Sequence, residues 1–229
     1  MLPEPLVLKW VSEMADAMAY VHSANIIHRD IKSPNFFLVD DRVLLGDFGL
    51  CRRAVTQTIT VGGTDVYMAP EMVMGQRYGK AADMWAIGCV LFEVCSGKFM
   101  WEIPGILGAQ AAASPEATQR LLNVVPTGYS KELIDIISSL LTPNPAQRPT
   151  AEDLLEIPIV AAAYRKDRQA WITEGGLPSP LRRSISAPPF FASPTRCPCA
   201  CVPVIKLMVQ RLLYRQPEAT DDQPDPTCC

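Results

Sequence analysis

The stretch His28-Arg29-Asp30-Ile31-Lys32-Ser33-Pro34-Asn35, followed after eleven residues by Asp47-Phe48-Gly49, decides how this sequence is interpreted. Phosphoryl transfer from a nucleotide needs a carboxylate that accepts the proton of the attacking hydroxyl, oxygen ligands for magnesium and a positive charge near the transferred phosphate. Asp30 supplies the carboxylate and Lys32 the charge. Asn35 and Asp47 supply oxygen ligands of the kind that Mg²⁺ prefers. The two stretches therefore point to phosphotransfer chemistry.

Three further motifs follow in order along the chain. They are Ala69-Pro70-Glu71, preceded by Gly63-Thr64; Asp83-Met84-Trp85-Ala86-Ile87-Gly88; and Arg148-Pro149-Thr150. Together with the first two stretches, this ordered set over roughly 120 residues resembles the eukaryotic protein kinases of the Ser/Thr type. The resemblance covers Pro5 to about Val160 and implies the large, C-terminal lobe of that fold.

The resemblance implies a role for each residue of the predicted site. Asp30, Lys32 and Asn35 are the implied catalytic residues, with Asp30 in the position of the general base. Lys32, Asn35, Phe37 and Asp47 are the implied ATP contacts, with Phe37 under the adenine; Asn35 and Asp47 are the implied Mg²⁺ ligands. The implied cofactors are therefore ATP and Mg²⁺. Without the resemblance, these residues could equally be turn-forming polar groups and an ordinary apolar strand residue.

Five further residues have implied structural roles. In the family, His28 stacks on Phe48 in an apolar spine that is anchored by a helix carboxylate, here Asp83. The arginine of the last motif, Arg148, pairs with Glu71. These residues are expected to hold the site rather than to do chemistry.

The implied regulatory residues are Arg29, Arg52, Thr60 and Thr64. A cation beside the catalytic aspartate is typical of kinases whose activation segment is ordered by a phosphate, because phosphothreonine adds close to two negative charges that arginines can pair. Thr60 lies eleven residues before Glu71, where that phosphosite usually sits. The hypothesis is that an upstream kinase modifies Thr60, with Thr56 or Thr58 as substitutes. The alternative is a solvated Thr-rich loop.

The implied partner is a protein substrate with a Ser or Thr acceptor. Lys32 and Thr64 are typical of the Ser/Thr-directed type, and Leu50 resembles members that favour serine. Pro34 stands where arginine-directed kinases often carry glutamate, which weakens an assignment to basic substrates. No particular substrate is predicted.

Composition bounds the remaining alternatives. The chain has 229 residues, 48% hydrophobic and 20% charged, which supports one full-sized domain and excludes a disordered protein, a coiled coil and a collagen-like repeat. The formal net charge of −3 gives no bulk positive field, so no nucleic-acid partner is expected. No apolar run has membrane-spanning length and no basic leader opens the sequence, so we expect no transmembrane segment and a soluble, cytoplasmic protein.

Periodicity predicts a mainly α fold with small β-hairpins. Apolar residues at helical spacing predict an amphipathic helix from Leu6 to about Ser23, and the apolar stretch from Ala82 to Cys95 predicts a helix buried on all sides. Shorter helices are predicted near 115–122, over 130–141 and from Thr150 to a stop at Pro158. Short strands are predicted at 25–28, 36–39 and 43–46, with a turn at Asp40-Asp41, and a long functional loop over 48–63.

Two regions follow from these patterns. Residues 1–162 are predicted to form the kinase-like C-lobe, and residues 163–229 a largely disordered, basic, proline- and cysteine-containing tail. In the tail, 204–215 could form a basic amphipathic helix that binds a partner, a membrane or the lobe itself. The close-set tail cysteines are interpreted as free thiols rather than a zinc site.

The sequence contains no Gly-x-Gly-x-x-Gly loop and no matching strand lysine, the parts with which the family's smaller lobe holds ATP. Lys9 lies in a helical pattern only 19 residues before His28, so it is interpreted as a surface lysine. Two explanations stay open. The chain is either a fragment of an active kinase, weak on its own, or a non-catalytic binding or regulatory module.

Overall fold

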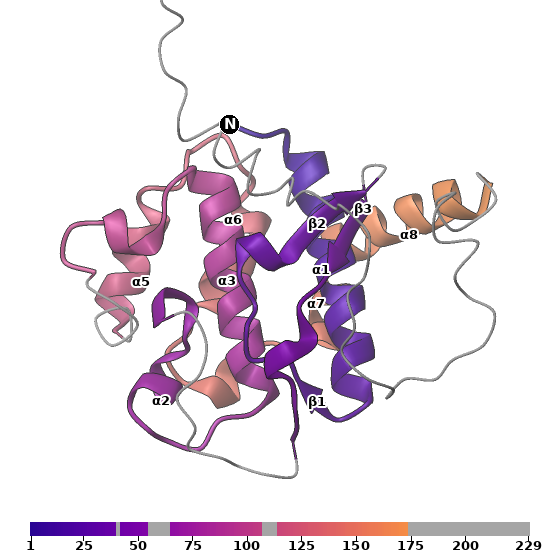
Figure 1. Cartoon of the computed structure of the whole chain (residues 1–229). Helices are drawn as coiled ribbons and strands as arrows, with labels where there is room; N and C mark the ends of the chain where they lie inside the picture. Colours follow the sequence, from indigo (N-terminus) through magenta and orange to yellow (C-terminus); the bar gives the residue numbers. More distant parts are fainter. Residues whose placement is uncertain (40–41, 55–64, 107–113, 174–229) are drawn as a thin grey trace, which may run out of the picture.

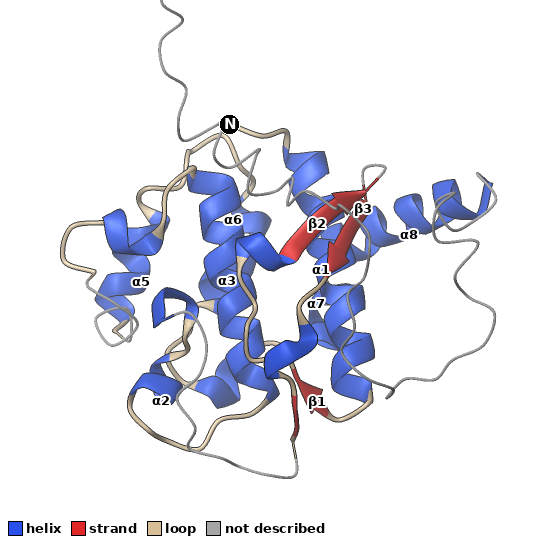
Figure 2. Cartoon of the chain, viewed as in Figure 1, coloured by secondary structure: helices blue, strands red, loops and turns tan. Residues whose placement is uncertain are grey.

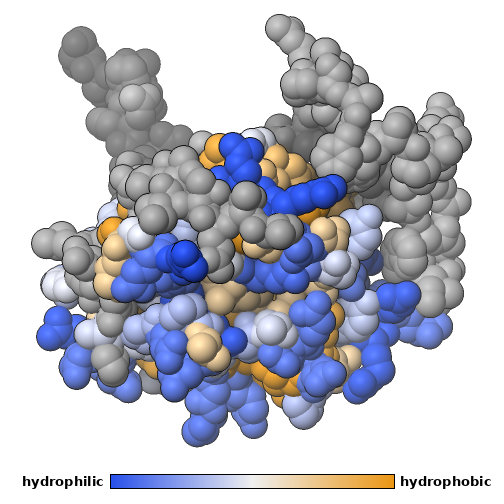
Figure 3. Space-filling model, turned by 90° about the horizontal axis from the view of Figure 1, so that it is seen from below, coloured by the Kyte–Doolittle hydropathy of each residue, from blue (hydrophilic) through white to orange (hydrophobic). Residues whose placement is uncertain are grey.

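The computed structural model describes residues 1–39, 42–54, 65–106 and 114–173. Within this part the chain is mainly helical, with two small antiparallel sheets (Figures 1 and 2). This confirms the mainly α, kinase-like fold class. On the face seen from below, hydrophilic residues gather around the edge, with apolar residues between them (Figure 3).

Helix α3 (Lys80–Ser96) is the centre of the fold. Every residue from Ala82 to Cys95 is buried, as expected of a helix that is apolar on nearly all sides. Gly97 ends the helix in the left-handed conformation, at φ 67°, which glycine adopts without steric cost. Because α3 has no solvent-facing side, the other elements are arranged around it.

A glycine allows close packing between α3 and α6 (Lys131–Leu140). A Cβ atom on Gly88 would lie 2.9 Å from Leu140 Cβ and from Leu141 Cδ2, so a larger residue would push the two segments apart. Ser130 caps α6, since its side chain accepts from the Leu133 N–H. Helix α5 (Pro115–Leu122) packs beside α6, and α2 (Pro70–Val73) is a single turn.

Helix α1 (Glu4–Ser23) joins the helical core to the small strands. Its apolar face is buried at Val7, Trp10, Val11, Met14 and Met18, which recur at the predicted helical spacing. Helix α1 also contacts β3 (Arg42–Leu45), α7 (Ala151–Glu156) and α8 (Pro158–Thr173). Helix α1 is thus covered on several sides by segments far away in sequence (Figure 1).

The two sheets have two strands each. Strand β2 (Phe36–Val39) pairs with β3 (Arg42–Leu45), as the predicted hairpin requires; its predicted turn lies outside the described residues. Strand β1 (Ile26–Ile27) pairs with β4 (Arg52–Arg53). The prediction of one uninterrupted loop over 48–63 was therefore wrong at its start, because the β1 backbone offers a pairing edge that no local pattern reveals.

Helix α8 runs through residue 163, where the sequence pattern placed the start of the tail. Thr150 caps α7 through a reciprocal capping box with Asp153, and that helix ends before Pro158 as predicted. Pro158 then opens α8, because proline is tolerated at the first helical position. The first residues of the predicted tail are therefore helical, and residues 174–229 lie outside the described part.

Candidate active site

Asp83, in the first turn of α3, holds the loop after β1. Its carboxylate accepts the backbone N–H groups of His28 at 2.8 Å and Arg29 at 2.9 Å, and it lies 2.9 Å from His22 Nε2. Asp83 is 2% exposed, so three polar partners satisfy a buried charge. Arg29 has a positive φ of 72°, and this anchoring holds the loop in that uncommon conformation.

Asp30 is the centre of a compact polar cluster. Lys32 Nζ lies 3.0 Å and 2.8 Å from its two carboxylate oxygens. Asn35 Nδ2 donates to the Asp30 backbone carbonyl at 2.7 Å and to its carboxylate at 3.0 Å. Asn35 belongs to a one-turn 3-10 helix, η1 (Ser33–Asn35), which places the two side chains together. The three predicted catalytic residues thus meet around one carboxylate.

The predicted magnesium ligands lie at the open end of the β2–β3 hairpin. Asn35 precedes β2, Asp47 follows β3, and the Gly46 N–H donates to the Asn35 carbonyl at 2.9 Å. Both side-chain hydrogen bonds of Asn35 use its nitrogen, so its amide oxygen is the atom offered to a cation. Asp47 is exposed, in the left-handed region at φ 58°, and its Oδ1 accepts from the Gly49 N–H at 3.3 Å.

This donor set fits magnesium, which is usually held by one or two protein oxygen ligands together with substrate phosphates and water. Throughout the residues that the structure describes, no group of three or more His, Cys, Asp or Glu side chains could hold a metal. The two oxygen groups that Asn35 and Asp47 offer would leave coordination positions for phosphate and water.

The ring residues predicted around the site lie in or beside residues 47–50, which we call the metal loop. The His28 and Phe48 rings meet edge to face, with centroids 5.0 Å apart, and His28 Nε2 lies 3.2 Å from the Gly46 carbonyl. Burial lowers the pKa of His28, against the opposing effect of Asp83. Phe37 covers Gly46 so closely that a Cβ there would lie 2.5 Å from its ring. Phe48 starts η2 (Phe48–Leu50) and is 46% exposed.

A buried ion pair ties α2 to the C-terminal part of the lobe. Arg148 binds the Glu71 carboxylate in a bidentate fashion, with both nitrogen–oxygen distances 2.7 Å. Its guanidinium also donates to the carbonyls of Thr142, Ala81 and Pro143, and it lies 5.0 Å from the Trp85 ring centroid. The carboxylate and the carbonyls satisfy the buried arginine, as a stable buried pair requires.

The family model described as "Protein kinase domain" matches residues 1–160. The chain belongs to the protein kinase family. The chain is 34% identical over 166 residues to the "Probable serine/threonine-protein kinase nek3" of Dictyostelium discoideum, an alignment that covers 67% of this chain and 14% of that protein.

Two further relatives are also Ser/Thr kinases by name. The mouse "Serine/threonine-protein kinase Nek9" is 33% identical over 167 residues, covering 71% of this chain and 17% of that protein. The human "Serine/threonine-protein kinase Nek11" is 33% identical over 159 residues, covering 68% of this chain and 24% of that protein. The chain therefore spans a quarter or less of the length of these three relatives.

Of the four predicted regulatory residues, the structure describes Arg29 and Arg52. Thr60 and Thr64 lie outside the described residues. Arg52 is exposed on β4, where its Nη1 donates to the Cys51 carbonyl at 3.4 Å. Arg29 lies with its guanidinium carbon 5.7 Å from the Tyr78 ring centroid. Because Thr60 lies outside the described residues, its relation to Arg29 and Arg52 stays a prediction.

The sequence patterns did not predict two buried ionisable side chains, His22 and Glu93. His22 contacts Asp83, and the only local signal was its position four residues after Met18 on the buried face of α1. Glu93 on α3 is 1% exposed beside Tyr67, whose hydroxyl lies 3.0 Å from Ser33 Oγ. Burial raises the pKa of Glu93 to about 8, although the Tyr67 and Ser33 hydroxyls oppose the shift. No pattern in the sequence marks this contact.

Among the described helices of the chain, none is both long enough and apolar enough to cross a membrane.

Proposed function

We propose that this chain carries the acceptor-binding and metal-binding part of a Ser/Thr protein kinase active site, which transfers the γ-phosphate of ATP to Ser or Thr hydroxyls of protein substrates. The observation that carries the proposal is the cluster in which Lys32 and Asn35 both contact the Asp30 carboxylate. Family membership supports the reaction class, and this geometry supports the division of roles.

In the proposed reaction, Asp30 accepts the proton of the substrate hydroxyl while that oxygen bonds to the γ-phosphorus and the bond to ADP breaks. Lys32, held against Asp30, keeps a positive charge beside the transferred phosphate. Asn35 Oδ1 and the Asp47 carboxylate would hold magnesium. The metal, when bound, offsets the negative charge of the phosphate oxygens. Phe37, packed over Gly46, would contact the adenine.

The printed sequence lacks the glycine-rich loop and strand lysine of the family, and both position the phosphates in phosphoryl transfer. We therefore expect the chain alone to bind nucleotide weakly and to turn over slowly. Weak binding is still measurable, because a ligand that binds only the folded state raises stability by mass action.

The test is thermal unfolding of the full chain with and without Mg²⁺ and ATP. We expect a melting temperature that rises with ATP only when Mg²⁺ is present, and no rise in Asp47→Ala. Asp135→Ala is the matched control, since Asp135 loses only an exposed ion pair with Lys131 on α6 and should respond like the wild type. Absence of a shift in the wild type would favour a binding module without a nucleotide site.

We also propose that Thr60 is phosphorylated by an upstream kinase. The support is chemical: Arg29 adjoins Asp30, and Arg52 is exposed on the strand before the Thr-rich segment. Thr60→Ala should block phosphate-dependent changes in activity and in protease sensitivity of residues 55–64. Unchanged behaviour of this variant after treatment with an upstream kinase would contradict the assignment.

A further inference from the structure

Helix α8 extends past the part of the chain that matches the family. The match ends at residue 160, whereas α8 continues to Thr173. The helix packs against α1 and crosses it, and its C-terminal end extends away from the rest of the lobe (Figure 1). Val160 is fully buried, and Tyr164 Oη donates to the Asp16 carboxylate on α1 at 2.9 Å. The first part of α8 is therefore docked on the lobe.

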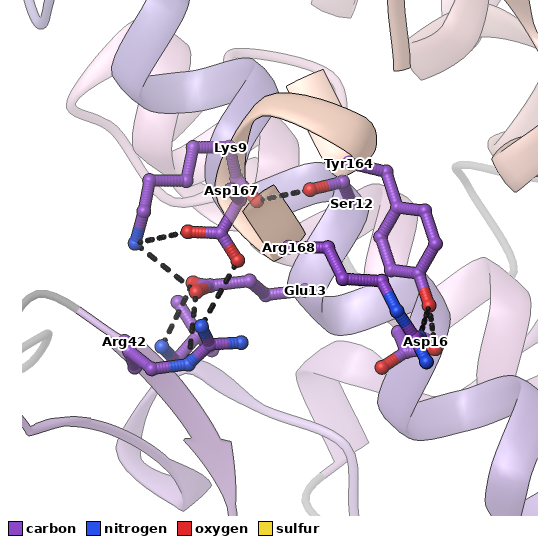
Figure 4. Close-up of polar contacts among 9 residues, drawn as sticks. Lys9, Ser12, Glu13, Asp16, Arg42, Tyr164, Asp167 and Arg168 are labelled. Carbon is purple, nitrogen blue, oxygen red and sulfur yellow. Dashed lines mark hydrogen bonds and ion pairs between the residues drawn. The ribbon is translucent and has the colours of Figure 1, made fainter. Parts of the chain in front are cut away.

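Four charged side chains from three elements meet where α8 passes α1 and β3 (Figure 4). Lys9 of α1 lies 3.0 Å from Glu13 and 3.4 Å from Asp167 of α8. Arg42 of β3 lies 3.6 Å from Glu13 and 3.1 Å from Asp167. Each cation thus contacts both carboxylates, and we call this group the charge ring. It also corrects the interpretation of Lys9 as a surface lysine, because the Lys9 side chain is only 25% exposed.

The charge ring depends on all four members. The Glu13 side chain is 3% exposed and that of Asp167 10%, and burial raises the pKa of Glu13. Without the two cations, the buried carboxylates of Glu13 and Asp167 would repel each other. Removal of Asp167 would leave two cations facing one carboxylate. Helix α8 therefore supplies the charge that balances Lys9 and Arg42 at this junction.

The charge ring holds the closed end of the β2–β3 hairpin. Arg42 is the first residue of β3 and pairs with Val39, the last of β2. The next residue, Val43, donates its backbone N–H to the second oxygen of Glu13 at 2.9 Å. The open end of the same hairpin, three strand residues or about 10 Å away, carries Asn35 and Asp47. A two-stranded hairpin has little stability of its own, so its direction depends on such contacts.

We propose that Asp167 is a positioning residue: through the charge ring, α8 orients the β2–β3 hairpin and with it the magnesium ligands Asn35 and Asp47. The consequence for magnesium rests on the proposed function, whereas the orientation of the hairpin does not. The active-site lobe of this chain thus includes a helix that lies mostly beyond the family match.

Hydrogen exchange and nucleotide binding of the full chain test the two parts separately. In Asp167→Asn we expect the amides of 36–39 and 42–45 to exchange about tenfold faster, with the α3 amides unchanged. The Mg²⁺ concentration needed for ATP-dependent stabilisation should rise severalfold. Asp167→Glu keeps the carboxylate and should restore both values, and Asp135→Asn, which disturbs only an exposed pair, should change neither.

Hairpin exchange in Asp167→Asn that equals the wild type, or that rises together with exchange in α3, would overturn the proposal. The second pattern would mean general destabilisation instead of positioning. If the wild type shows no ATP-dependent stabilisation, the proposed function fails, and the exchange rates alone still decide whether α8 orients the hairpin. Failure of Asp167→Glu to restore the wild-type values would likewise count against a role for the carboxylate.

Discussion

The floor of the site and its metal loop are held in very different ways. The floor is buried: Asp30 and Asn35 are each 6% exposed and Asp83 is 2% exposed, and each is fixed by several hydrogen bonds. The metal loop is open, with Phe48 46% and Leu50 39% exposed. The difference shows that the lobe itself fixes the proposed acceptor side of the site, whereas the proposed nucleotide side presents apolar groups to solvent.

The largest expected effect comes from breaking the buried ion pair that ties α2 to the C-terminal part of the lobe. Arg148→Ala leaves the Glu71 carboxylate buried without its partner, together with three backbone carbonyls. We expect a loss of about 3–5 kcal/mol in the free energy of unfolding, measured by denaturant titration. Lys131→Ala removes only an exposed ion pair and should leave stability unchanged. Stability of Arg148→Ala equal to that of this control would show that the buried pair does not hold the lobe together.

A second effect, which depends on pH, is expected at Glu93. Its pKa in the folded state is about 8, whereas an exposed glutamate has 4.5. Between these values the folded protein keeps a proton that the unfolded chain has released, so this group makes stability fall as pH rises from 4.5 to 8. The slope for one proton is at most about 1.4 kcal/mol per pH unit.

Glu93→Gln removes this titration and tests the assignment. Its unfolding free energy relative to the wild type should increase between pH 5 and pH 8 and become constant above that range. Denaturant titrations of both proteins at several pH values provide the measurement. Parallel pH profiles for the two proteins would show that Glu93 ionises normally in the folded state.

The smallest effect on stability is expected in the metal loop. Phe48→Ala removes an edge contact with His28 from a side chain that is already half exposed, so the cost should be about 1 kcal/mol or less. The same change should lower binding of a hydrophobic dye, because it removes apolar surface from the open side. A loss as large as that of Arg148→Ala would mean that the metal loop is held as firmly as the buried ion pair.

Local sequence patterns were sufficient for the elements whose physics is local. The helical spacing of apolar residues in α1, the all-apolar α3, and the capping residues Ser130 and Thr150 all led to helices where the structure has them. The order of the motifs also brought Asp30 and Asn35 into one predicted site. Local patterns did not predict elements that are stabilised by a segment distant in the sequence. Strand β4 forms by pairing with β1, and α8 packs against α1.

By itself, the sequence determined the chemical inventory: a carboxylate, a lysine and two oxygen ligands at the spacing of a kinase catalytic and magnesium loop. Only the tertiary structure decided how these groups are supported. It placed His22 and Asp83 behind the loop, Glu93 beneath Tyr67, and Lys9 in the charge ring with Asp167. The physical reason is that spacing along the chain encodes local conformation, whereas burial and charge pairing arise between residues far apart in the sequence, such as His22 and Asp83 or Lys9 and Asp167.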